Sequence, residues 1–330
     1  MMKESFHLVP NRLPYPAMEI CRFAPSASGR AHPGTLLAGL LAWLDARSRG
    51  AQFILRIEDI DPQRTTEQWR QGLLEDLSWF GLDWDHLDIQ SNFTARHHAV
   101  LDRLHELGRL YPCACTKAEL RRSRVILPDG SIPYPGFCRQ RPLADWRTSL
   151  DNIRCNLEGA HRALTDESGE DLSPGPGRDI GDPVVRRRDG SITYPLAVVA
   201  DDGASGVTRI VRGRDLIPCT PVQVALFHLL GYPLPTYRHH LLLLEPRGDK
   251  MAKFHGAVGA DTLRRVYRPD VLCGLLAHVA GLQERPDPIR PSDLVAAFDW
   301  RRVRREDQVL AWEDGQLHWR PSAVPVSVTP

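Results

Sequence analysis

A loop of glycine and small polar residues lies directly before the first strongly helical segment of the chain. Residues 26–34 place Gly29, His32 and Gly34 at the start of a helix predicted over residues 35–49. The free N–H groups and the dipole of a helix N-terminus favour phosphate, and glycine lets a nucleotide approach the backbone. The spacing is H-x-G, not the dinucleotide pattern G-x-G-x-x-G. Taken alone, it fits an ordinary loop histidine as well as a phosphate site.

Three of the seven cysteines lie close together in the sequence, at Cys113, Cys115 and Cys138. Seven cysteines would leave one unpaired in a disulfide framework, so the cluster fits a metal better than a secreted scaffold. Three thiolates and one further donor would complete a tetrahedral structural zinc site. Buried thiols are the alternative for so short a pattern, and we expect the other four cysteines to be buried thiols.

The elements around the glycine loop follow an α/β pattern. Apolar runs at residues 19–24 and 53–57 predict buried strands on either side of the helix at 35–49, which makes a βαβ unit. Two further helices are expected from about Thr65 to Gly81 and over residues 94–107. This alternation predicts a doubly wound α/β sheet with the glycine loop in its first βα connection.

The second half of the chain continues the pattern after two interruptions. Residues 109–140 are expected to form an insertion, and residues 166–183 a linker rich in glycine, proline and aspartate. The elements predicted beyond them are a strand at 195–199, a helix at 220–230 closed by Gly231, a strand at 241–244, and helical sequence after Ala260 that becomes rich in proline and arginine.

Composition places the chain among globular proteins of one or two domains, with 330 residues, 42% hydrophobic and 25% charged. No apolar run approaches the roughly 18 residues that cross a bilayer, and the N-terminus lacks the features of a signal peptide. We therefore expect a cytoplasmic protein without membrane contact. The net charge of +1 gives no overall basic excess. Arginine clusters at 121–124, 186–188 and 301–305 could meet phosphate, although solvated surface charge is the simpler interpretation.

Longer motifs around the loop resemble a known family. The segments RFAPSASGRAHPGT at residues 22–35 and FILRIEDIDPQRT at residues 53–65 resemble the nucleotide fold of glutamyl- and glutaminyl-tRNA synthetases. The resemblance continues in the family's order with YPLAVVADD from Tyr194, VRGRDL around Arg212, and KMAK at residues 250–253, a form of the KMSKS loop. It implies a class I aminoacyl-tRNA synthetase with a Rossmann-like nucleotide-binding fold, a zinc-binding insertion and a short helical C-terminal region.

The resemblance assigns a glutamate pocket to residues on both sides of the insertion. Arg22 and Arg212 would hold the carboxylates through their guanidinium groups, and Glu58 would pair with the α-ammonium group. Tyr194 would form a wall of the pocket. The remaining residues assigned to it are Phe23, Ala24, Pro25 and Ser26. Without the surrounding motifs, surface ion pairs and a core aromatic ring would be the commoner explanations.

An ATP site is also implied by the resemblance. The residues assigned to it are Ser28, Gly29, His32, Gly34, Thr35 and Lys253. His32, Lys250 and Lys253 would be catalytic, because they would stabilise the charge that develops as glutamate attacks the α-phosphorus. Mg²⁺ is expected with ATP. Ala27 and Ala252 depart from the family pattern, and the missing serine hydroxyl at position 252 is a reason to expect slower activation or altered loop closure.

In the short glutamyl-queuosine members of this family, a tyrosine completes the zinc motif. The spacing Tyr134-x-x-x-Cys138 resembles that motif and implies Tyr134 as fourth ligand to one structural Zn²⁺ per chain. The region after Lys253 is too short for the anticodon-binding region of ordinary glutamyl-tRNA synthetases. The chain therefore resembles the glutamyl-Q tRNA(Asp) synthetase family, which implies a monomer that uses ATP, L-glutamate and queuosine-containing tRNA(Asp), with glutamate activated before any tRNA binds.

The implied organisation has four parts. They are the first half of the catalytic domain at 1–108, the zinc-containing insertion and linker at 109–183, the second half at 184–245, and the KMSKS-like loop with a helical region and no anticodon-binding domain at 246–330. Two other classes stay open. H-x-G loops also serve nucleotidylyltransferases, and Ala252 leaves room for a non-catalytic RNA-binding relative. Exchange of ATP with pyrophosphate that requires glutamate separates the three.

Overall fold

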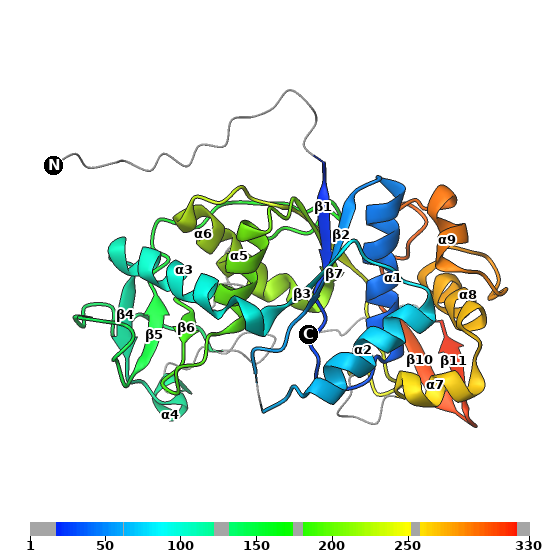
Figure 1. Ribbon diagram of the computed structural model, residues 1–330, viewed down its shortest axis with the longest axis horizontal. Coiled ribbons are helices and arrows are strands. Elements are labelled where there is room, and N and C mark those ends of the chain that lie inside the picture. The colour runs from blue at the N-terminus through cyan, green and yellow to red at the C-terminus, as the bar shows by residue number, and fades with distance from the viewer. Residues whose placement is uncertain (1–17, 62, 122–131, 174–180, 252–257, 322–330) are drawn as a thin grey trace, which may run out of the picture.

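A five-stranded parallel sheet forms the centre of the protein (Figure 1). The structure is a computed structural model that describes residues 18–61, 63–121, 132–173, 181–251 and 258–321. The sheet has the order β3-β2-β1-β7-β8. Its strands are β1 (Ile20–Phe23), β2 (Gln52–Ile57), β3 (His86–Ile89), β7 (Arg209–Gly213) and β8 (Thr236–His240). Because β1 pairs in parallel with both β2 and β7, the two halves of the chain meet at β1.

Helices lie on both sides of this sheet, which confirms the doubly wound α/β fold (Figure 1). On one side are α1 (Pro33–Ser48), α2 (Glu67–Phe80), α8 (Pro269–Ala280) and α9 (Pro291–Leu294). On the other are α3 (Thr94–Glu106), α5 (Tyr194–Ala204) and α6 (Thr220–Leu230). The helical spacing of the leucines in α1 is explained by their burial, since Leu36, Leu40 and Leu44 belong to one core cluster with the strands.

The second predicted helix begins slightly later than expected. Its N-cap is Thr66, whose hydroxyl accepts a hydrogen bond from the backbone N–H of Trp69 at 3.2 Å. The helix ends at Gly81, which has φ 96°, a left-handed conformation that favours glycine. Short 3₁₀ turns occur at η1 (Gln90–Phe93), η2 (Arg214–Cys219) and η4 (Val295–Ala297).

The strand predicted at residues 195–199 is wrong, because these residues form the first half of helix α5. Pro195 occupies the first turn, where its missing N–H costs no hydrogen bond. Residues 196–199 are all buried, so the helix has no polar face here to reveal its period. A short apolar run of this kind does not distinguish a buried helix from a buried strand.

The strand predicted at residues 241–244 is also misplaced. The strand that completes the central sheet is β8, which precedes it and contains the buried polar residues His239 and His240. Only β9 (Leu243–Leu244) falls within the predicted range, and it pairs with β10 (Gln308–Glu313) in a separate sheet. The strand β8 was not predicted because the prediction relied on apolar runs and β8 contains polar residues.

A small antiparallel sheet organises the insertion. It consists of β4 (Leu110–Cys113), β5 (Asn152–Cys155) and β6 (Val184–Arg186), and the short helix α4 (Lys117–Arg121) follows β4. Because β6 belongs to this sheet, the central parallel sheet resumes only at β7.

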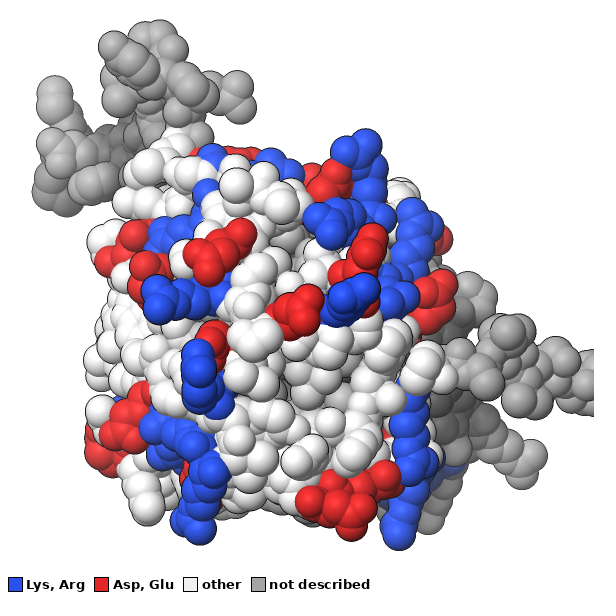
Figure 2. All heavy atoms as spheres, turned by 90° about the vertical axis from the view of Figure 1, so that its right-hand side faces the viewer, with Lys and Arg blue, Asp and Glu red and all other residues white. Residues whose placement is uncertain are grey.

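The C-terminal region contains the expected helices and an additional hairpin. Helix α7 (Ala260–Val266) precedes α8 and α9, and β10 then pairs with β11 (Gln316–Arg320). Figure 2 shows the face of the protein formed largely by this region, where acidic and basic side chains are interspersed. Arg301 pairs with Asp299, and Arg304 packs over Trp319 at 5.1 Å, which favours solvated surface charge over a phosphate site. No helix in the described residues is long and apolar enough to span a bilayer.

Candidate active site

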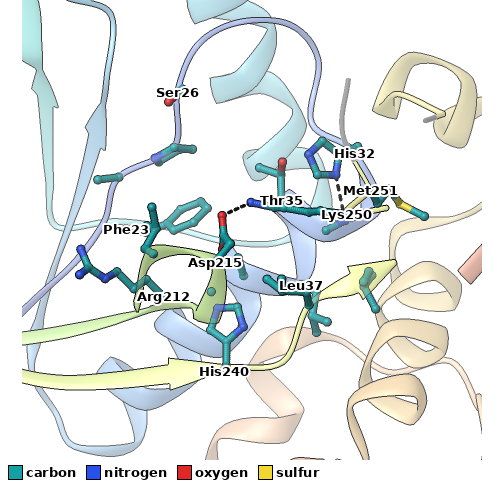
Figure 3. A pocket seen from close by; sticks show the side chains of 18 of the residues that line it. Phe23, Ser26, His32, Thr35, Leu37, Arg212, Asp215, His240, Lys250 and Met251 are labelled. Atoms are coloured by element: carbon teal, nitrogen blue, oxygen red, sulfur yellow. Dashed lines mark hydrogen bonds and ion pairs between the residues drawn. The ribbon is translucent and has the colours of Figure 1, made fainter. Parts of the chain in front are cut away.

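Most of the predicted site residues surround one cavity of about 320 Å³ at the carboxyl ends of β1 and β7 (Figure 3). Open α/β sheets bind ligands outside the carboxyl ends of their strands, at the point where the strand order reverses. Here β1 and β7 meet at that point. The predicted residues on the wall are Arg22, Phe23, Ala24, Pro25, Ser26, Ser28, His32, Gly34, Thr35, Tyr194, Arg212 and Lys250.

His32 is the N-cap of α1 and lies on the cavity wall. Its Nδ1 accepts a hydrogen bond from the backbone N–H of Gly34 at 3.1 Å, so in the neutral ring the proton lies on Nε2. A Cβ added to Gly34 would lie 3.0 Å from the imidazole ring, which explains the glycine beside it. The site thus combines an imidazole donor with the positive end of a helix dipole, an arrangement that suits phosphate.

Arg212, at the end of β7, is a buried cation held by neutral groups. Its Nη1 donates to Gln223 Oε1 at 2.8 Å and its Nη2 to Thr220 Oγ1 at 2.7 Å. Its Nε donates to His239 Nε2 at 3.1 Å. Within the described part of the chain no carboxylate forms an ion pair with it, although its side chain is only 5% exposed. Since a buried charge is costly without a counter-charge, an anionic ligand group would complete this environment.

Arg22 has a counter-ion inside the protein. Its Nε and Nη2 donate to the two carboxylate oxygens of Asp202 at 3.3 and 3.1 Å, and Arg56 donates to the same carboxylate. Burial acts to raise the pKa of Asp202, but the two guanidinium groups outweigh it and hold the pKa below its usual value. This fork orients Arg22 on the cavity wall, and because its hydrogen bonds to the described residues use only Nε and Nη2, Nη1 could bind a ligand.

Glu58 lies in an adjoining cavity and not in the first one. The two cavities share the wall residues Ala24, Ser26, Ser28, Tyr194, Asp215, Leu216 and Lys250. Burial raises the pKa of Glu58 to about 7, although Arg22 and Arg56 oppose the shift. Its carboxylate has neither a hydrogen bond nor an ion pair with any residue that the structure describes. Tyr194, the first residue of α5, lines both the cavity that contains Arg212 and the one that contains Glu58.

Lys250 reaches the cavity from the turn that follows β9. A bridge to Leu244 fixes its backbone, and its Nζ forms an ion pair with Asp215 (Figure 3). Asp215 needs Gly213 two residues earlier, because a Cβ there would lie 2.5 Å from its carboxylate oxygen. The predicted catalytic residue Lys253 lies outside the described residues. Gly29, at φ 150°, is the described ATP-site prediction that is absent from both cavity walls.

Sequence reasoning missed several residues that complete the site. Asp202 and Asp215 were inside the quoted YPLAVVADD and VRGRDL motifs and could have been found, whereas His239 depends on which elements become neighbours. His240 lines the cavity, where its Nδ1–H donates to the Leu241 carbonyl at 2.7 Å and its Nε2 lacks a partner among the described residues. Burial lowers the pKa of His240 to about 4, so Nε2 is a neutral acceptor on the wall.

The three predicted cysteine ligands converge in the insertion. The sulfur atoms of Cys113, Cys115 and Cys138 lie within 4.8 Å of one another, and those of Cys115 and Cys138 are 3.6 Å apart. Tetrahedral coordination with Zn–S bonds of about 2.3 Å places two sulfurs roughly 3.8 Å apart, so the set fits zinc. The hydroxyl of Tyr134 lies 3.5 Å from the sulfur of Cys113 and 4.0 Å from that of Cys115. The structure therefore places the predicted fourth ligand beside the three thiols.

Arg154 on β5 contacts two residues of this cluster. Its Nε donates to the sulfur of Cys113 at 3.2 Å, and its guanidinium lies over the Tyr134 ring at 3.7 Å from the centroid. The thiolate is the form of cysteine that binds metal, and a guanidinium at this distance would balance part of the charge of a metal-bound sulfur. The three cysteines, Tyr134 and Tyr111 belong to a small core cluster that is separate from the main ones. A metal here would therefore hold the insertion together.

Comparison with known proteins identifies the family. Residues 20–139 and 171–272 match the family described as "tRNA synthetases class I (E and Q), catalytic domain". The chain is 40% identical over 306 residues to a protein of Symbiobacterium thermophilum named Glutamyl-Q tRNA(Asp) synthetase, covering 86% of this chain and 94% of that protein. It is 42% identical over 314 residues to a protein of the same name from Nocardia farcinica, covering 92% and 96%.

Solved structures agree on the fold. The glutamate-tRNA synthetase of Elizabethkingia anophelis superposes with a TM-score of 0.72 over 88% of this chain and 68% of that chain, at 22% identity. That similarity supports the fold alone, whereas the sequence matches extend through the cavity and the cysteine cluster. The chain therefore belongs to the family of class I tRNA synthetases for glutamate and glutamine, in the branch of the glutamyl-Q tRNA(Asp) synthetases, and it is a ligase.

Proposed function

We propose that this protein activates L-glutamate with ATP in the absence of tRNA and then transfers the glutamyl group to queuosine in the anticodon of tRNA(Asp). One observation supports the amino-acid part above the others, namely the buried guanidinium of Arg212, whose three contacts are neutral. Three of its five N–H bonds are used, so two remain for a carboxylate. The acceptor part is supported by the names of the relatives.

Glutamate offers two carboxylates and one ammonium group, and the shared walls offer complementary charges. Arg212 and the Nη1 group of Arg22 would bind carboxylates, and the half-buried Glu58 would bind the ammonium group. Tyr194 lies on the wall that both cavities share. This division of charge would orient the amino acid so that its α-carboxylate faces the nucleotide.

The nucleotide would bind with its phosphates at the N-terminus of α1. His32 would donate from Nε2 to the triphosphate, and Lys250 would exchange its ion pair with Asp215 for phosphate oxygens. A carboxylate oxygen of glutamate forms a bond to the α-phosphorus as the bond from that phosphorus to the bridging oxygen of pyrophosphate breaks. Mg²⁺ accompanying ATP would neutralise phosphate charge, and it needs no cage built wholly from protein.

The test is glutamate transfer to three RNAs: queuosine-containing tRNA(Asp), tRNA(Asp) with guanosine at the same position, and tRNA(Glu). Exchange of pyrophosphate with ATP is expected to require glutamate but no RNA. Transfer is expected with the modified tRNA(Asp) alone, because a site that hydrogen-bonds a hydroxyl discriminates strongly against its absence. Charging of unmodified tRNA(Glu) at its 3′ end would replace this proposal with an ordinary glutamyl-tRNA synthetase.

A matched control distinguishes transfer at the anticodon from transfer at the 3′ end of the tRNA. Modified tRNA(Asp) that lacks its 3′-terminal adenosine keeps queuosine and loses the usual acceptor. We expect it to accept glutamate as well as the intact RNA does. Raising the salt concentration is expected to weaken the binding of both RNAs equally, because salt screens their phosphate contacts. The dependence of transfer on queuosine is expected to remain.

A further inference from the structure

Asp76 is a carboxylate on α2 that contacts the loop before α1. Its side chain is fully buried, and Oδ2 accepts a hydrogen bond from the backbone N–H of Ala31 at 2.9 Å. Oδ1 forms an ion pair with Arg30. Ala31 directly precedes His32, the N-cap residue of α1. The carboxylate therefore holds the backbone next to the imidazole that faces the cavity.

The same carboxylate also contacts α7, which lies beyond the KMAK segment. Arg264 on α7 forms an ion pair through Nη2 with Asp76 Oδ1 at 2.9 Å and packs over the ring of Trp79 at 5.2 Å. The first residue of α7, Ala260, donates its backbone N–H to the carbonyl of Ala31 at 2.7 Å. Both backbone polar groups of Ala31 are thus held, one by α2 and the other by α7.

Two glycines make room for the Arg30 side chain in this arrangement. A Cβ added to Gly72 on α2 would lie 2.7 Å from Nη1 and 3.1 Å from Cδ of Arg30. A Cβ added to Gly259 would lie 3.2 Å from Cβ of Arg30. Arg30 therefore passes between α2 and the start of α7, and no larger residue at position 72 fits without moving it.

From this geometry we propose that Asp76 is a positioning residue for the nucleotide site. It fixes Ala31 and, through Ala31, the direction of His32 and of the first turn of α1. Asp76 lines neither cavity, so it acts only through the loop. The proposal rests on the proposed function, because it places the phosphates of ATP at this helix end.

Asp76→Asn is the first test, in glutamate-dependent exchange measured against each substrate. Asparagine keeps the shape and one acceptor but loses the charge that holds two arginines. The KM for ATP is expected to rise about tenfold and kcat to fall, while the KM for glutamate stays within about twofold, because misplacing a binding group acts on its own substrate. A change of equal size in both KM values would show a general loss of structure.

Asp45→Asn is the matched control. Asp45 is also a buried carboxylate, bound by Arg209 and by Trp300, but it lies outside the loop and both cavities. This variant is expected to lower the melting temperature about as much as Asp76→Asn does and to leave both KM values within about twofold of the wild type.

Gly72→Ala tests the same idea without removing the carboxylate. Alanine favours a helix over glycine, so α2 itself gains stability from this change. The added methyl group displaces Arg30, and the KM for ATP is expected to rise without a loss of melting temperature. If Asp76→Asn and Gly72→Ala both keep the wild-type KM for ATP, the positioning role is wrong. If the wild-type protein shows no glutamate-dependent exchange, the proposed function fails instead.

Discussion

Arg212 donates from Nε to Nε2 of His239 over 3.1 Å, which makes this histidine an acceptor toward the buried cation of the cavity. The opposite ring nitrogen, Nδ1, lies 2.8 Å from the carboxylate of Asp166 and donates to it. Burial lowers the pKa of His239, although Asp166 opposes the shift, so the ring is neutral. Asp166 thereby fixes the tautomer that leaves Nε2 free to accept from Arg212.

Replacing His239 is expected to damage the use of glutamate. In His239→Leu the Nε–H of Arg212 loses its buried partner, at a cost of about 1–3 kcal/mol, and the KM for glutamate rises about tenfold or more. His239→Gln carries an amide oxygen that can accept the same hydrogen bond, so it is expected to recover most of the loss. Exchange kinetics against glutamate and ATP measure both. Equal behaviour of the two variants would contradict this role.

The affinity for glutamate is expected to depend on pH through Glu58. Its pKa is raised to about 7 in the protein without ligand, and only the ionised carboxylate pairs with an ammonium group. The KM for glutamate should therefore rise as pH falls below 7, approaching about tenfold per pH unit. In Glu58→Gln the KM is high throughout and this dependence is lost. A wild-type KM that stays constant between pH 6 and pH 8 would place the ammonium group elsewhere.

The substitution Glu58→Gln is also expected to stabilise the folded protein at alkaline pH. Burial raises the pKa of Glu58 from 4.5 to about 7, so above pH 4.5 the unfolded chain loses this proton more readily than the folded one. The folded state is penalised progressively up to about pH 7, by roughly 1–3 kcal/mol in the free energy of unfolding. Denaturant unfolding at pH 4.5 and at pH 8 measures the effect. Glu58→Gln should exceed the wild type in stability at the higher pH only.

One zinc ion is expected per chain, bound by the cysteine cluster. Cys115→Ser is expected to abolish stoichiometric metal in freshly purified, reduced protein, whereas Tyr134→Phe, which keeps all three thiols, weakens binding. Cys155→Ser is the matched control, because Cys155 is a buried thiol of the same insertion outside the cluster. Metal analysis decides, and wild-type protein free of zinc, or zinc retained in Cys115→Ser, would refute the assignment.

The parts of the fold that follow from local pattern were predicted from the sequence. Features that are recognised from adjacent residues were found. They are the leucine spacing of α1, the apolar strands β1 and β2, and the glycine at the end of α2. Helix α5 was mistaken for a strand because burial on all sides removes the polar face that reveals a helix. The strand β8 was missed for the opposite reason, since His239 and His240 are polar residues in a buried position.

The candidate site divides in the same way. Motifs assigned Arg22 and Arg212 to a glutamate pocket and His32 to an ATP site, which needed only the family's order of segments, and the structure brings all three to one cavity wall. Their partners were not predictable from local sequence. Asp202 reaches Arg22 across 180 residues, and whether a buried arginine has an internal counter-ion depends on which helix covers it. The contrast between the paired Arg22 and Arg212 with its neutral partners appears only in three dimensions.

The position of β1 between β2 and β7 has a consequence for how the protein is made. The backbone N–H of Ile20 donates to the hydroxyl of Thr208, 188 residues later in the chain. A growing polypeptide leaves the ribosome N-terminus first, so one edge of β1 stays without its partner while the whole insertion is synthesised. Contacts of such sequence separation form late and slowly. A prematurely terminated chain would thus carry the loop before α1 without Arg212, and under the proposed function it could not join glutamate to ATP.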